Sequence, residues 1–112
     1  MSGVIAAAER ASLAGHLRHL VAVMERERQA LATLDADALF LIVREKEELC
    51  EALGHFGSEA LDETTRGLAE TARQLNEVNR RVRNLLAANV AARIAALGGT
   101  ARSGALALTA RV

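Results

Sequence analysis

The chain has 112 residues, no Pro, Trp or Tyr, a single Cys and fourteen basic against fourteen acidic side chains. A chain of this length forms one domain, and its richness in Ala, Leu, Glu and Arg is typical of a helical bundle or coiled coil. The lone cysteine excludes an internal disulfide and a cysteine zinc cluster.

No stretch approaches about 18 uncharged apolar residues, so we expect no helix that spans a membrane. The apolar run from Val4 to Ala8 is too short for the core of a signal peptide. The expected location is therefore the cytoplasm.

The first predicted helix carries one apolar stripe at α-helical spacing, interrupted by the charge of Glu27. Asp35 and Asp37 follow it, and an aspartate accepts hydrogen bonds from the free N–H groups at the start of a helix. We therefore expect the helix to stop there and a second to begin. The stripe consists of Leu13, Leu17, Leu20, Met24, Leu31 and Leu34.

The second predicted stripe has its own intruding charge, Lys46. If the chain folds back at the two aspartates, Lys46 lies opposite Glu27, at the same distance from the turn. The sequence thus predicts an antiparallel helical hairpin joined by a Glu27–Lys46 ion pair; a single kinked helix is the main alternative. The apolar pairs expected around it are Leu34–Leu39, Leu31–Ile42, Met24–Leu49 and Leu20–Leu53.

Gly54 to Ser58 is the clearest break in the pattern. We expect Ser58 to cap a third helix that runs to about Leu97 and ends at Gly98 and Gly99. Residues 1–99 then form the helical domain and residues 100–112 a flexible tail. In the third helix, Glu63, Glu70 and Glu77 recur every seven residues, each with an arginine three positions on, at Arg66, Arg73 and Arg80; such pairs define a solvent face.

The opposite face of the third helix is a half-polar seam, in which asparagines stand where a self-sufficient core would have leucine. An asparagine in a seam specifies register at a cost in stability. The seam consists of Thr65, Leu68, Ala72, Leu75, Asn79, Val82, Leu86 and Asn89.

Helix lengths indicate where a partner binds. The third helix spans about 60 Å and the second about 27 Å, so we expect residues from about Glu77 to Leu97 to project without a partner from their own chain. An apolar stripe left in water marks an interaction site. The predicted client-binding residues are Asn79, Val82, Leu86, Asn89, Val90, Ile94 and Leu97, with help from Leu106 and Leu108 in the tail.

Nothing in the sequence predicts catalysis. His16 and His19 lack the Glu-x-x-His pattern of a di-iron bundle and are expected at the surface, as is the charged run Arg44 to Glu48 apart from Lys46. Cys50 adjoins the second stripe, so we expect it buried. We assign no catalytic residue, metal or cofactor. The second half of the chain is rich in arginine but has no aromatic residue to stack on bases, so no nucleic-acid partner is expected.

The order and separation of several residues carry a resemblance to a known family. They are Leu20-x3-Met24-x2-Glu27-x2-Ala30-Leu31, Asp37-x-Leu39, Lys46-x2-Leu49-x3-Leu53 and Leu75-Asn76-x2-Asn79-x6-Leu86-x2-Asn89. This pattern, within residues 13 to 97, resembles the FlgN family of flagellar export chaperones.

The resemblance implies a cytoplasmic helical protein. It would bind the hook–filament junction proteins FlgK and FlgL through its C-terminal helical region and deliver them to the flagellar type III export gate. Members commonly carry a tyrosine after the last long helix, and this chain has none, which puts docking of the tail at the gate in question. The alternative function is a structural coiled-coil homodimer or adaptor whose overhangs pair with each other.

Overall fold

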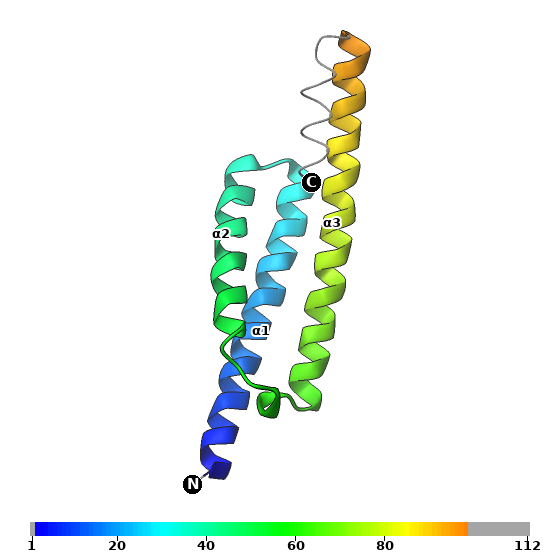
Figure 1. Ribbon diagram of the computed structural model, residues 1–112. Helices are drawn as coiled ribbons and strands as arrows, with labels where there is room; N and C mark the ends of the chain where they lie inside the picture. The colour runs from blue at the N-terminus through cyan, green and yellow to red at the C-terminus, as the bar shows by residue number, and fades with distance from the viewer. Residues whose placement is uncertain (1, 99–112) are drawn as a thin grey trace. The chain divides into compact units, whose positions relative to one another are not determined.

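The computed structural model describes residues 2–98, and these residues form the predicted all-α fold (Figure 1). The elements are α1 (Ser2–Thr33), α2 (Ala36–Leu53), a short 3₁₀ helix η1 (Ser58–Ala60) and α3 (Glu63–Leu97). Gly99 and the predicted tail, with Leu106 and Leu108, lie outside the described residues. The chain divides into two compact units between Asn76 and Glu77. The first is called here the N-terminal unit. Residues 77–97 of the second are called the C-terminal segment.

The turn between α1 and α2 begins at Leu34, which adopts a left-handed backbone with φ of 54°. The Leu34 N–H donates to the carbonyl of Leu31 at 3.3 Å, and the Asp35 N–H donates to that of Ala30 at 2.9 Å. These two bonds form a Schellman motif, which ends a helix by satisfying its last carbonyls. The Leu34 side chain is 69 % exposed. The predicted Leu34–Leu39 pair is therefore wrong, because the left-handed residue turns its side chain out of the stripe.

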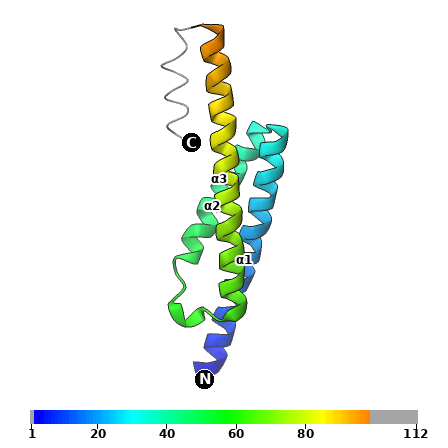
Figure 2. The same ribbon diagram turned by 90° about the vertical axis from the view of Figure 1, so that its right-hand side faces the viewer.

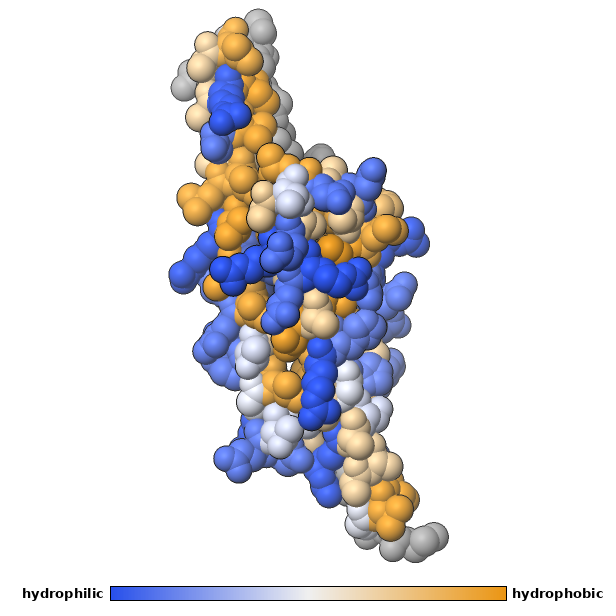
Figure 3. All heavy atoms as spheres, turned by 180° about the vertical axis from the view of Figure 1, so that it is seen from behind, coloured by the Kyte–Doolittle hydropathy of each residue, from blue (hydrophilic) through white to orange (hydrophobic). Residues whose placement is uncertain are grey.

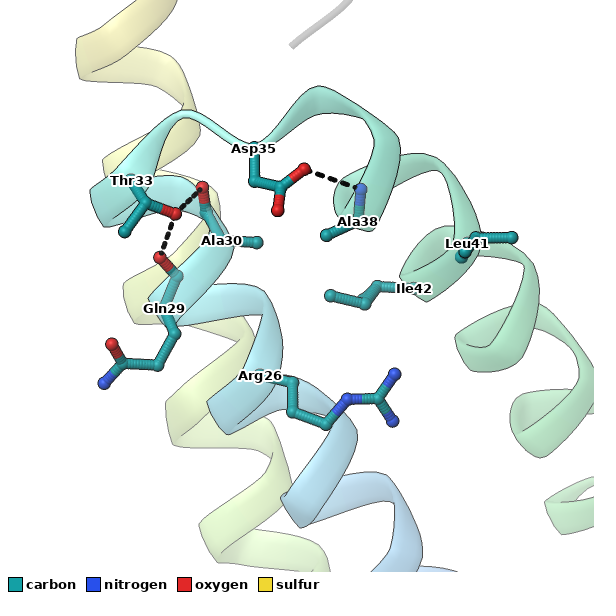
Figure 4. Close-up of a pocket in the computed structure, with 8 residues that line it drawn as sticks. All are labelled: Arg26, Gln29, Ala30, Thr33, Asp35, Ala38, Leu41 and Ile42. Carbon is teal, nitrogen blue, oxygen red and sulfur yellow. Dashed lines mark hydrogen bonds between the residues drawn. The ribbon is translucent and has the colours of Figure 1, made fainter.

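Asp35 starts α2 as the sequence predicted. Its Oδ1 accepts a hydrogen bond of 3.0 Å from the Ala38 N–H (Figure 4). At the end of α1, Thr33 Oγ1 donates to the carbonyl of Gln29 at 3.1 Å. The chain reverses here, and α1 and α2 run antiparallel, side by side (Figure 1). The structure thus has the predicted hairpin and not the single kinked helix.

The core of the N-terminal unit consists of two apolar clusters. The larger joins α1 to α2 and to the first half of α3, which runs beside α1 (Figures 1 and 2). Burying a Val, Leu or Met side chain contributes about 1.5–3 kcal/mol. The buried members of the larger cluster are Leu20, Val23, Met24, Ala30, Ile42, Leu49 and Ala72. The smaller cluster consists of Leu13, Leu17 and Ala60, with Phe56 and Leu68 packed against it.

Two details of the core differ from the predicted stripes. Val23 is fully buried although the first stripe omits it. The cluster that holds Ile42 contains Ala30, whereas the sequence paired Ile42 with Leu31, which is also buried. Both differences arise because a buried helix presents more than a single row of side chains to two neighbouring helices.

The start of α3 is capped by Asp62 rather than by Ser58, so the predicted cap is wrong. Asp62 Oδ1 accepts from the Thr65 N–H at 2.8 Å, and Thr65 Oγ1 accepts from the Asp62 N–H at 2.8 Å. This reciprocal pair satisfies two backbone donors at the helix end. The Thr65 hydrogen bonds hold the pKa of Asp62 below its ordinary value. Ser58 instead begins η1, a separate turn.

Candidate functional site

The structure brings Glu27 and Lys46 together inside the N-terminal unit. Lys46 Nζ donates to Glu27 Oε1 at 3.0 Å and to Oε2 at 3.3 Å. The Glu27 side chain is 1 % exposed and the Lys46 side chain 16 %, so the carboxylate is buried and the ammonium group is partly buried. Lys46 Nζ also donates to Asn76 Oδ1 at 3.1 Å. One ammonium group therefore links α1, α2 and α3. The sequence did not assign this role to Asn76, although that residue belongs to the pattern that carries the family resemblance.

A second charged contact joins α1 to α2 on the surface. Glu45 Oε1 lies 2.8 Å from His19 Nε2, and Glu45 Oε2 accepts from Arg26 Nη1 at 3.0 Å. The hydrogen bond with His19, followed by that with Arg26, lowers the pKa of Glu45 below its ordinary value. The sequence predicted only that Glu45 lies at the surface; the structure adds that its carboxylate connects α2 to two side chains of α1. His19 itself is exposed, as expected.

The predicted Glu–Arg pairs are present on α3 at residues 70/73 and 77/80. Arg73 Nη2 lies 2.6 Å from Glu70 Oε1 in the N-terminal unit. In the C-terminal segment, Arg80 Nη2 lies 2.7 Å from Glu77 Oε1, and Arg81 adds a contact of 3.2 Å to the same oxygen. The hydrogen bond from Arg80 is the main cause that lowers the pKa of Glu77 to about 2.

The predicted client-binding residues of the C-terminal segment differ in exposure. Leu97 is 88 % and Val90 44 % exposed, and Asn89 is exposed as well. The side chains of Val82, Leu86 and Ile94 are half-buried. Asn79 is buried, so the segment does not present it at the surface.

The structure adds Leu85 to the segment's exposed apolar surface. Its side chain is 70 % exposed, and Val78, seven residues earlier, is also exposed. Hydrophobic side chains gather over the C-terminal end of α3 in Figure 3. The sequence missed this row because Val78 is flanked by Glu77 and Asn79, and three arginines lie between Val78 and Leu85. The spacing of seven was the signal that could have found it.

Two hollows in the N-terminal unit have apolar linings. One, of about 280 Å³, is lined by residues that include Leu13, Leu53 and Phe56. The other, of about 260 Å³, includes Met24 and Cys50 in its lining. Cys50 is exposed, so its predicted burial is wrong; it lies about 100° around the helix from Leu49 and so leaves the core face.

A third hollow, of about 340 Å³, lies at the hairpin turn between Arg26 and Leu41 (Figure 4). Arg26 is engaged with Glu45, and Asp35 is engaged as the cap of α2. The polar groups at this hollow therefore serve the hairpin itself.

Residues 2–98 contain no group of three His, Cys, Asp or Glu side chains placed to hold a metal ion. In the same range, no helix combines the length and apolar character needed to cross a bilayer. Comparison with protein-family models, with curated proteins and with solved structures found no match.

Proposed function

We propose that this protein is a cytoplasmic flagellar export chaperone of the FlgN type. Its clients would be the terminal helices of hook–filament junction proteins similar to FlgK and FlgL, held before delivery to the export gate. The observation that carries this proposal is the exposed apolar surface of the C-terminal segment, with Leu85, Val90 and Leu97 in water. The residue pattern that resembles the FlgN family supports it.

The mechanism is burial of one amphipathic helix against another. A client helix that covers these side chains removes apolar area from water, at about 25 cal/mol per Å². Such helix-on-helix recognition uses anchors at helical spacing and needs no cofactor or energy source. Covering the client's terminal helices would keep them from associating early and leave them available for export.

The experiment that tests this function is a binding titration with the C-terminal helices of a FlgK-like protein. The variant Leu86→Ala with Val90→Ala removes two anchors one helical turn apart and is expected to lower affinity by about tenfold or more. Circular dichroism should show helix content close to that of the wild-type protein, because Val90 is exposed and Leu86 only half-buried.

A matched control is Val4→Ala with Ile5→Ala, which truncates two exposed apolar residues at the start of α1. Client affinity should stay at the wild-type value in this control. Wild-type affinity in the Leu86/Val90 variant would show that the C-terminal segment is not the site. No binding by the wild-type chain itself would reject the proposed client class.

A further inference from the structure

The side of α2 that points away from the core carries an exposed aromatic residue. Phe40 is 65 % exposed and is one of only two aromatic residues in the chain. The guanidinium carbon of Arg44 lies 5.9 Å from the centre of its ring, a cation–π distance. Aromatic side chains that remain at a surface are frequent anchors of protein interfaces. The fold does not need Phe40 in its core, which leaves an intermolecular role open to it.

This side of α2 is also acidic. The outer face of α2 is defined here by exposed residues at steps of one, three or four, which share one side of the helix. It has four carboxylates and one guanidinium, a net charge of −3. Among the ion pairs of residues 2–98, none involves these carboxylates. The face consists of Asp37, Phe40, Arg44, Glu47, Glu48 and Glu51.

We propose that the outer face of α2 binds the C-terminal segment of a second copy of this chain. The segment has the complementary charge, since its four arginines against Glu77 give a net charge of +3; they are Arg80, Arg81, Arg83 and Arg93. It also has exposed apolar side chains, above all Leu85, to cover Phe40.

Length and net charge agree with this pairing. The segment spans about 32 Å and α2 about 27 Å, so the two helices can pair over nearly their whole lengths. The chain has a formal net charge of zero, and proteins near zero net charge do not repel their own copies. Complementary patches of this kind set register and exclude wrong partners.

The contact joins two different surfaces, so it is heterologous: it closes into a dimer if both copies exchange segments and otherwise extends into a chain of copies. It covers Leu85 in the absence of a client, and a client for the same segment competes with the second copy. This self-association goes beyond the proposed function, and its test needs no client.

Sedimentation of the full chain over a range of concentrations tests the proposal. We expect self-association that weakens as ionic strength rises from about 0.01 to about 1 M, over which the screening length falls from about 30 to about 3 Å. Glu47→Lys with Glu48→Lys should weaken it about tenfold or more, because like charges then face each other. The control, Glu9→Lys with Glu25→Lys, makes the same change in net charge at exposed positions of α1 and should leave association unchanged.

A charge swap identifies the partner surface. Arg83→Glu with Arg93→Glu should weaken self-association as well, and mixing this variant with the Glu47/Glu48 variant should restore association in mixed complexes. Circular dichroism of each variant checks that the helices persist. A wild-type chain that stays monomeric at every concentration would overturn the proposal. Self-association that is as strong in the variant Glu47→Lys with Glu48→Lys as in the wild-type chain would also overturn it, because the C-terminal segments would then pair with each other.

Discussion

Lys46 Nζ lies 3.0 Å from Glu27 Oε1, and this ion pair joins α2 to α1 with its carboxylate fully buried and its ammonium group partly buried. Met24 and Leu49, each three positions along the helix from a member of the pair, belong to the larger apolar cluster. A charged pair in this position favours a single register of α1 against α2, because a shift of one residue between the helices would separate each charge from its partner.

The first prediction concerns removal of one partner of this pair. Glu27→Gln should lower the free energy of unfolding by about 3–5 kcal/mol, since the partly buried Lys46 is then left without an opposite charge. Urea unfolding followed by circular dichroism measures this change. Replacing both partners, Glu27→Leu with Lys46→Met, should be neutral or stabilising.

The control for this prediction is Glu25→Gln, which removes a neighbouring carboxylate that is exposed on α1. Its effect should lie within about 0.5 kcal/mol of zero. If Glu27→Gln were as mild as Glu25→Gln, the ion pair would contribute little to the hairpin.

The second prediction concerns the cap of α3. Thr65→Val keeps the shape of a buried side chain but removes the acceptor of the Asp62 N–H, and should cost about 1–3 kcal/mol. Asp62→Ala should lower the melting temperature as well, since the Thr65 N–H loses its acceptor. Ser58→Ala is the matched control: a melting temperature reduced as much by this change as by Thr65→Val would mean that Ser58 caps the helix after all.

The hairpin and its ion pair were predictable because helical period and distance from the Asp35 turn determine which residues oppose each other. The cap of α3 was not, because Ser58 and Asp62 are both capping residue types, and only the path of the intervening chain decides which one reaches the helix end.

The candidate site was likewise predictable from the sequence only in part. Periodicity located the C-terminal segment as apolar, but neighbouring residues such as Leu85 and Leu86 point about 100° apart on a helix. Periodicity alone does not decide which of the two is exposed, nor that Asn79 is buried. The sequence did not predict the outer face of α2 as a binding surface, because the periodicity of the inner apolar stripe of α2 was the stronger signal.

The third prediction concerns Leu34 at the hairpin turn. A left-handed backbone costs a residue with a side chain roughly 1–2 kcal/mol, a cost that glycine does not have. Leu34→Gly should therefore raise the free energy of unfolding by about 1 kcal/mol, because the exposed leucine contributes little packing in return. Urea unfolding measures this gain. The control is Leu41→Gly, an equally exposed leucine within α2, which should lower stability by about 1 kcal/mol; a loss of stability in both variants would contradict the prediction.

The last prediction concerns acid. The pKa of Glu77 is lowered from 4.5 to about 2 in the folded chain, chiefly by the hydrogen bond from Arg80. A lowered pKa means that the folded state favours the ionised carboxylate, so its contribution to stability is complete above pH 4.5 and disappears as the pH falls towards 2. An NMR titration of the Glu77 carboxyl carbon should show ionisation persisting down to about pH 2.

The variant Arg80→Gln tests the cause of this shift. It should move the midpoint of the Glu77 titration upward, towards 4.5, although Arg81 still contacts the same oxygen. The matched control, Arg93→Gln, removes an exposed arginine that makes no ion pair with Glu77 and should leave the midpoint in place. High salt should raise the wild-type midpoint, since exposed ion pairs are screened. A wild-type midpoint near 4.5 at low salt would show that the Glu77–Arg80 contact does not persist in solution.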